Sequence, residues 1–374
     1  MKKIKPLALY LPQYHPTDLN DKWWGKGFTE WTNVTKAKPL YDGHQQPLLA
    51  GDLGYYDLRL PEVREQQANL AREYGVYGFI YYHYWFGNGV QTLERIANEV
   101  LESGKPEFPF CFCWANETWT GIWHGLSNEI IAEQVYPEGD VEKHFDYLLP
   151  FFKDDRYIKV DNCPVFIVYD PIHLNENNNS YLSILRKLAQ NNGFQDLHII
   201  AGNKLEDDLD YKSLNYQGKI TDAFKKSWVK EIQKNATNCS NSITTKEYYK
   251  NRIKGVFGLQ NKPSEGKLVN QQDMSEIVKN LKFTEKDIPT YPCVMPNWDN
   301  TPRSGTNGIV INNATAENFK KQIEKAKEYL EDKNYPEHFL IIKSWNEWAE
   351  GNIMEPDRNN KHAFLETLKK TLEQ

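Results

Sequence analysis

Two carboxylates three residues apart, Glu347 and Glu350, have the type and setting that cleavage of a glycosidic bond requires. That reaction needs one carboxyl group as general acid and a second as base or nucleophile. The two groups must differ in pKa, and the neighbouring Trp345 and Trp348 can raise one pKa by desolvation. The alternative is a solvated loop that carries two acids. The flanking tryptophans and Asn346 favour the catalytic interpretation.

Further polar and aromatic residues stand at or after the ends of other predicted strands. A sugar ring has apolar C–H faces and a rim of hydroxyls, so flat aromatic rings beside amides and carboxylates suit it. We therefore expect these residues to bind substrate. They are Tyr10, Glu30, Trp31, His83, Tyr84, Trp85, Trp114, Asn116, Glu117, Trp119, Asp299, Arg303, Trp345 and Asn346.

Several of these candidates have structural alternatives. Asn116 could instead brace the loop that follows its strand, and a lone histidine such as His83 often has a structural role. Asp299 and Arg303 are close enough in sequence to pair with each other rather than line a site.

The elements that must position these residues alternate along the chain. Apolar runs predict strands at residues 6–11, 76–82, 108–114, 164–169, 197–202, 220–224, 291–295 and 339–345. Helical spacing predicts helices at 60–74, 92–102, 141–152, 181–190, 272–279, 316–331 and 362–372. Such alternation indicates a parallel sheet buried on both faces. The eight strand predictions, and the absence of a glycine-rich nucleotide loop, favour a (β/α)8 barrel over an open doubly wound sheet. In such barrels the active site lies at the carboxyl ends of the strands.

One (β/α)8 domain is expected to cover all 374 residues, since barrels of roughly 250 residues with insertions fold as one unit. Residues 12–58 form a long loop rich in Trp, Gly and Pro, a length typical of functional loops. Residues 225–290 are polar and are interpreted as an insertion.

The amino-acid composition argues against several classes of binding partner and cofactor. The net charge of −6 and the lack of a basic stripe argue against nucleic acid. The sequence has no run of about 18 apolar residues, so no membrane span is predicted. The N-terminus lacks the apolar region of a signal peptide. We therefore expect a cytoplasmic protein. The five cysteines are interpreted as free thiols, without a zinc pattern, and no metal or other cofactor is expected.

The segment from Asn346 to Gly351, Asn-Glu-Trp-Ala-Glu-Gly, resembles a signature of glycoside hydrolase family 99, the endo-α-mannosidases and endo-α-mannanases. A closer resemblance is to a family 99-like group, the WbsX type, often described as glycosyltransferases and found among surface-polysaccharide biosynthesis genes. The shared motifs are Leu11-Pro-Gln-Tyr-His-Pro16, Gly27-Phe-Thr-Glu-Trp31, Trp114-Ala-Asn-Glu117 and Trp345-Asn-Glu-Trp-Ala-Glu350.

Family 99 implies a (β/α)8 barrel and a retaining, metal-free hydrolysis. By motif position, Glu347 would be the base that removes the proton of the sugar's own 2-hydroxyl, which then attacks C1 to give a 1,2-anhydro sugar. Glu350 would protonate the leaving oxygen and then activate water. Family 99 motifs commonly have His where this chain has Ala349, so a contact from that side chain is absent.

Three functions remain open on sequence. The first is a retaining glycoside hydrolase or transglycosylase that acts on an oligosaccharide or polysaccharide. The second is a glycosyltransferase with a nucleotide-sugar donor, for which Asp208-Leu-Asp210 is a weak acid-x-acid match and no other diphosphate site is found. The third is a carbohydrate-binding barrel without catalysis, which the presence of both glutamates disfavours.

Overall fold

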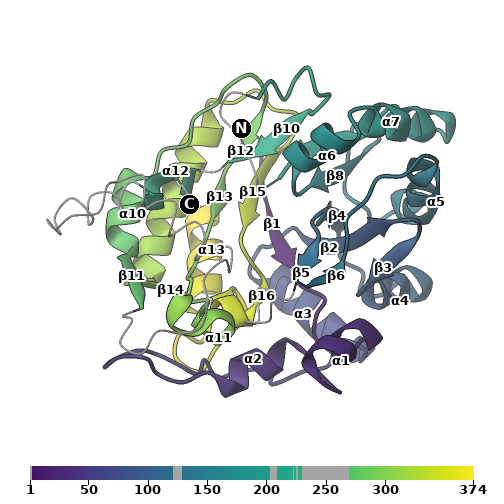
Figure 1. Ribbon diagram of the computed structural model, residues 1–374. Coiled ribbons are helices and arrows are strands. Elements are labelled where there is room, and N and C mark those ends of the chain that lie inside the picture. Colours follow the sequence, from purple (N-terminus) through teal and green to yellow (C-terminus); the bar gives the residue numbers. More distant parts are fainter. Residues whose placement is uncertain (1, 121–128, 203–208, 222, 225, 230–268) are drawn as a thin grey trace, which may run out of the picture.

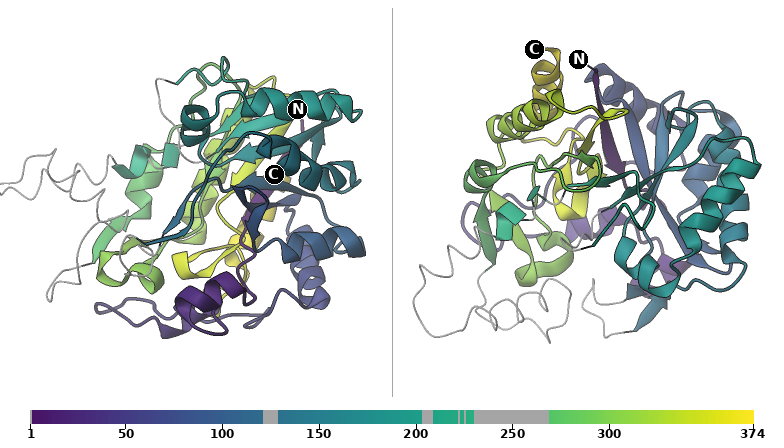
Figure 2. Two further views of the ribbon diagram at one scale, coloured as in Figure 1. Left: turned by 45° about the vertical axis from the view of Figure 1, so that its right-hand side comes forward. Right: turned by 90° about the horizontal axis from the view of Figure 1, so that it is seen from above.

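The barrel is built from parallel strands that follow one another around a closed circuit (Figures 1 and 2). The computed structural model describes residues 2–120, 129–202, 209–221, 223–224, 226–229 and 269–374. The barrel strands are β1 (Ile4–Tyr10), β2 (Gly78–Gly87), β4 (Phe110–Trp114), β8 (Cys163–Val168), β9 (His198–Ala201), β10 (Gly218–Ile220), β12 (Thr290–Tyr291), β13 (Cys293–Val294) and β15 (His338–Ile342).

Two short strands, β12 and β13, occupy one position in the circuit. β12 pairs with β10 and β13 pairs with β15, and only Pro292 separates them. Proline has no N–H to give to the ladder, whereas its carbonyl still accepts from the N–H of Ile341 at 2.9 Å. Residues 290–294 therefore bridge β10 and the last strand, β15, which itself pairs with β1, and the predicted (β/α)8 barrel is confirmed.

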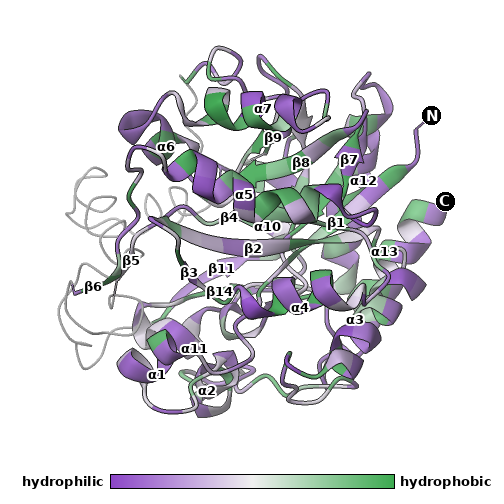
Figure 3. Cartoon of the chain, turned by 90° about the vertical axis from the view of Figure 1, so that its right-hand side faces the viewer, coloured by the Kyte–Doolittle hydropathy of each residue, from purple (hydrophilic) through white to green (hydrophobic). Residues whose placement is uncertain are grey.

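Amphipathic helices cover the outside of the barrel (Figure 3). In α12, Thr315 caps the first turn by accepting from the N–H of Asn318, and Phe319, Ile323 and Leu330 form a buried stripe. The helices are α3 (Pro61–Glu73), α4 (Arg95–Ser103), α5 (Asp140–Lys153), α6 (Pro171–Asn177), α7 (Tyr181–Asn191), α10 (Met274–Asn280), α12 (Ala316–Glu331) and α13 (Ala363–Glu373). Among the described residues, none of these helices has both the length and the apolar character that crossing a bilayer demands.

The sixth predicted strand, residues 220–224, is misplaced. The strand β10 ends at Ile220, and Ala223 and Phe224 are already helical. Their side chains pack with Met274 and Ile277 in a small cluster separate from the main core. The apolar run therefore spans the end of a strand and the start of a helix, which buries its residues in two different places.

Short elements gather at the carboxyl ends of the strands. The long loop of residues 12–58 contains α1 (Asp18–Trp24) and α2 (Glu30–Lys36), which lie at the same end of the barrel as α11 (Thr301–Ser304) (Figures 1 and 3). Helix α2 contacts α11 and the 3-10 turn Trp348–Glu350. The remaining short strands are β3 (Val90–Thr92), β5 (Trp119–Thr120), β6 (Ile130–Ala132), β7 (Lys159–Val160), β11 (Asn270–Asp273), β14 (Ile309–Asn312), β16 (Asn346–Glu347) and β17 (Asn352–Ile353).

The predicted insertion at residues 225–290 is described only in part. Residues 269–290 supply β11, α10 and the first residue of β12, whereas most of the segment lies outside the described residues. Strand β11 pairs in parallel with β14 beside the barrel and is not part of the barrel sheet.

Candidate active site

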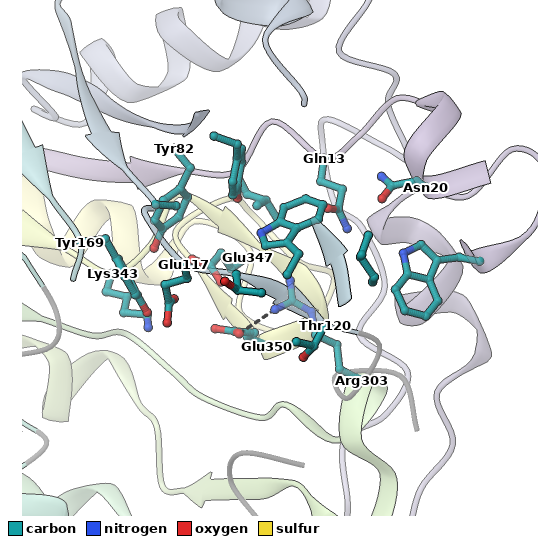
Figure 4. Close-up of a pocket in the computed structure, with 17 residues that line it drawn as sticks. Gln13, Asn20, Tyr82, Glu117, Thr120, Tyr169, Arg303, Lys343, Glu347 and Glu350 are labelled. Carbon is teal, nitrogen blue, oxygen red and sulfur yellow. Dashed lines mark hydrogen bonds and ion pairs between the residues drawn. The ribbon is translucent and has the colours of Figure 1, made fainter. Parts of the chain in front are cut away.

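A cavity of about 220 Å³ opens at the carboxyl ends of the barrel strands (Figure 4). Six of the residues predicted for the site line it, and they come from four separate segments of the chain. They are Tyr84, Glu117, Trp119, Arg303, Glu347 and Glu350. The two glutamates lie at the centre of the view, with Glu117 and Lys343 beside Tyr169 on one side and Gln13 and Asn20 on the other.

The turn after β15 presents both glutamates to the cavity. Glu347 ends β16, and the 3-10 turn that follows carries Glu350. Ser344 fixes the start, since its hydroxyl accepts from the N–H of Glu347 at 3.2 Å and donates to the carbonyl of Asn352 at 2.7 Å. Gly351 follows with φ +54°, and a Cβ there would lie 3.0 Å from the backbone of Asp299, so the position needs glycine.

Arg303 holds Glu350 in its ionised state. Its Nη1 lies 2.6 Å from Oε1 of Glu350, and its Nη2 contacts Oε1 of Glu30, which is fully buried. Burial on its own would raise the pKa of Glu350, but Arg303, Lys343 and the hydrogen bond from Glu347 together bring that pKa below its usual value.

The pKa of Glu347 is shifted in the opposite direction, upward. Its side chain is buried and hydrogen-bonded to Glu350. Burial, followed by the negative charge of Glu350, raises the pKa of Glu347 to about 8, against the opposing effect of Lys343 and Arg303. Two carboxyls in contact cannot both ionise cheaply, so near neutral pH the pair holds one proton, which protonated Glu347 donates to Glu350.

Four other predicted residues support the turn from behind the cavity. Glu30 accepts from the N–H of Ala349 at 3.2 Å in addition to binding Arg303. Trp31 packs 5.2 Å from Trp348 between ring centroids. The amide of Asn346 bonds both backbone groups of Leu11, and Trp345 is fully buried beneath the turn.

Asp299 does not pair with Arg303. Its carboxylate instead accepts from Gln46 at 2.6 Å and contacts Nε2 of His44 at 2.8 Å. The local pairing considered on sequence is wrong, because Arg303 is directed toward Glu30 and Glu350. Asp299 anchors the loop of residues 12–58 to the segment after β13.

Five predicted residues lie away from the cavity. Tyr10 donates to Gln67 of α3, and Trp85 donates to Asp140 of α5, so both side chains lie on the outer side of the barrel strands. His83 contacts His144 at 2.8 Å between Nε2 atoms, where burial lowers the pKa of His83 to about 3. The other two are Trp114, fully buried, and Asn116.

Asn116 has the bracing role that was its alternative. Its side chain accepts from the N–H of Asp170 and donates to the carbonyl of Asp170, both at 2.8 Å, which ties the end of β4 to the start of α6. Its Nδ2 also donates to the hydroxyl of Tyr136 at 3.1 Å, so both polar atoms of this amide are engaged by protein groups outside the cavity lining.

Replacing Asn116 by alanine is expected to lower the free energy of unfolding by roughly 2 kcal/mol, because the N–H of Asp170 loses this acceptor and the carbonyl of Asp170 loses one donor while it keeps the donor from Leu174. Urea unfolding measures the change. The matched control is Asn192→Ala, whose amide bonds only the carbonyl of Leu188 at an exposed helix end, and a change within about 0.5 kcal/mol is expected there. Equal stability of the two variants would contradict the bracing role.

The cavity also contains residues that sequence reasoning did not assign to it. They are Leu11, Gln13, Asn20, Trp24, Tyr82, Ala115, Thr118, Thr120, Ile131, Tyr169 and Lys343. Tyr169 and Lys343 directly follow β8 and β15, and Tyr82 lies one residue before the pairing of β2 with β4 ends, so the barrel rule could have found them. Gln13, Asn20 and Trp24 belong to the long loop, where no periodicity indicates which side chains face inward.

The described residues contain no group of three His, Cys, Asp or Glu side chains arranged to hold a metal ion. Of the acid-x-acid match, Asp208 lies outside the described residues. Asp210 accepts from the N–H groups of Lys212 and Ser213 in a local turn.

Comparison with known proteins now decides the family. The family described as Glycosyltransferase WbsX matches residues 6–368. The chain belongs to the WbsX family. The protein WxcX of Xanthomonas campestris pv. campestris is 30% identical over 367 residues, which are 98% of this chain and 49% of WxcX. This WbsX-family chain thus spans about half the length of the curated relatives it matches.

Solved structures share the barrel at low sequence identity. The GH99 endo-alpha-mannosidase from Bacteroides thetaiotaomicron superposes with a TM-score of 0.55 at 14% identity, covering 100% of this chain and 98% of that one. A glycoside hydrolase-like protein gives a TM-score of 0.59 at 12% identity, covering 100% and 94%. This WbsX-family chain therefore shares its barrel fold with these structures.

Proposed function

We propose that this WbsX-family chain acts on a glycosidic bond of an oligosaccharide or polysaccharide, with Glu347 and Glu350 as its acid and base. The observation that carries the proposal is the state of this pair. The buried carboxyl of Glu347 and the largely buried carboxyl of Glu350 interact in a cavity, and Arg303 forms an ion pair with Glu350 and not with Glu347. Such a pair holds one proton and one charge, which are the two forms that glycoside cleavage uses.

The resemblance to family 99 suggests how the pair works. Glu347 takes the proton of the 2-hydroxyl, whose oxygen attacks C1, while Glu350 protonates the departing oxygen. In the free protein, however, the proton is on Glu347. That route therefore begins with transfer of this proton along the hydrogen bond to Glu350, which leaves Glu347 as the carboxylate that serves as base. An internal nucleophile gains effective molarity, so the protein supplies only proton transfer and positioning.

The remaining lining fits a sugar. Trp24, Trp119 and Tyr84 offer aromatic faces for C–H groups, and Gln13 and Asn20 offer amides for hydroxyls. The cavity combines these apolar faces with a few polar groups, as carbohydrate sites do.

Transfer to an acceptor sugar is the second candidate, which the family's description favours. Lys343 gives it a chemical basis, because its side chain lines the cavity beside the pair and offers a cation to an anionic donor. In this reaction the base of the pair would activate an acceptor hydroxyl in place of water.

A thermal-shift panel separates the two reactions. We expect manno- or gluco-configured iminosugars or short oligosaccharides to stabilise the protein, because a ligand at 100 times its dissociation constant adds about 2.7 kcal/mol. The stabilisation should weaken in Glu347→Gln. Nucleotide sugars, with and without Mg²⁺ or Mn²⁺, form the other arm. A shift with one nucleotide sugar and none with iminosugars would reject hydrolysis in favour of transfer.

A further inference from the structure

Another buried carboxylate, Glu355, lies just past the turn that carries Glu347 and Glu350 and outside the cavity lining. Three side chains donate hydrogen bonds to it. Nε1 of Trp348 lies 2.6 Å from its Oε2, the hydroxyl of Tyr56 lies 2.9 Å from the same oxygen, and Nε2 of Gln67 lies 2.7 Å from Oε1. These contacts join α3, the long loop and the turn at one point.

The surrounding network is arranged for an ionised carboxylate. The hydroxyl of Tyr10 donates to Oε1 of Gln67, so Nε2 of Gln67 faces Glu355 as a donor. The hydroxyl of Tyr56 accepts from Asn346 at 3.3 Å and so directs its own hydrogen to Glu355. An indole N–H can only donate. Each of these three neighbours therefore donates, and none offers an acceptor to a protonated Glu355.

A contribution to folding stability does not explain why Glu355 is surrounded by hydrogen-bond donors that favour its ionised form. Burial raises the pKa of Glu355 to about 7, although Trp348, Gln67 and Tyr56 oppose that effect. A carboxyl whose pKa is higher in the folded than in the unfolded chain stabilises the fold at low pH, and this contribution is lost as pH rises from about 4.5 to about 7. Near and above pH 7 the ionised group thus lowers stability, so its role lies elsewhere.

The bond from Trp348 connects Glu355 to the chemistry. Trp348 stands between Glu347 and Glu350 in the turn, and its backbone N–H lies 3.4 Å from the hydroxyl of Tyr14. We propose that Glu355 is a positioning residue that fixes, through the Trp348 indole, the turn that carries the two catalytic glutamates. This inference rests on the proposed glycosidic function of that pair.

The test compares Glu355→Gln with Asp140→Asn, a buried carboxylate that accepts the indole N–H of Trp85 at 3.0 Å away from the cavity. The probes are 2,4-dinitrophenyl glycosides of the manno and gluco series. In Glu355→Gln we expect kcat to fall by roughly 10- to 100-fold, because displacement of about 1 Å can cost that much. KM should stay within about twofold, since Glu355 does not touch the cavity, and kcat is expressed per folded molecule because the new amide NH₂ group faces three donors. Asp140→Asn should keep its kcat.

A double-variant cycle shows whether Glu355 acts through the indole. Trp348→Phe removes the N–H, and the double variant should be no slower than the slower single variant. Additive losses, or a Glu355→Gln protein with unchanged kcat beside an active wild type, would overturn the positioning role alone. A wild type that turns over none of these glycosides would reject the glycosidase proposal and this inference together. A melting temperature that falls while kcat per folded molecule holds would indicate a purely structural residue.

Discussion

Replacing Glu350 by glutamine is expected to lower turnover by about 10² to 10⁴, the contribution of one general acid and base. Glutamine has nearly the same shape and can still accept from Arg303, so the fold should persist. Arg303 also keeps its ion pair with Glu30. Steady-state kinetics give the loss in kcat, and urea unfolding shows whether the variant is folded.

The leaving group tells which role Glu350 plays. A 2,4-dinitrophenolate departs without protonation, so the deficit of Glu350→Gln should shrink on that substrate if Glu350 is the acid. The control is Glu366→Gln, an exposed position on α13 paired only with Lys370, where no loss is expected. Unchanged turnover in Glu350→Gln would remove the proposed mechanism.

Sequence patterns located the turn that presents Glu347 and Glu350 to the cavity because its signal is local. An apolar run predicts β15, and the two glutamates follow within eight residues of its end at Ile342. The barrel rule then places them at the mouth. Helix α12 was predicted with the bounds the structure has, Ala316–Glu331, because its cap and apolar stripe also lie within one element.

The direction of side chains on β2 could not be predicted in the same way. Tyr82 and Tyr84 face the cavity, whereas His83 and Trp85 face α5. Alternation separates the two pairs, but a strand buried on both faces has aromatic residues on each side. The sequence pattern does not indicate which of the two alternating sets of side chains points into the barrel, and so His83 and Trp85 were expected in the site.

The contacts of Arg303 required the tertiary structure. Its two carboxylate partners, Glu30 and Glu350, are 273 and 47 residues away along the chain. From sequence, the nearby Asp299 is the simplest partner, because a local pair needs no knowledge of the fold. The long loop brings Glu30 behind the turn, where Arg303 contacts both Glu30 and Glu350. The charge of Arg303 favours the ionised form of Glu350.

Removing the other member of the pair should change the pH dependence as well as the rate. Burial and the charge of Glu350 raise the pKa of Glu347 to about 8, so the pair keeps its one proton below that pH and loses it above. In the wild type, kcat/KM should therefore fall as pH rises through about 8, since this ratio reports the free enzyme. Glu347→Gln should lose turnover by about 10² to 10⁴ and show no alkaline limb near pH 8. The profile is measured between pH 5 and 10 with a glycoside whose alcohol or sugar leaving group has a high pKa, because such a leaving group departs only with the proton of the pair. A limb that persists at the same pH in Glu347→Gln would assign that titration to another group and leave the single shared proton without kinetic support.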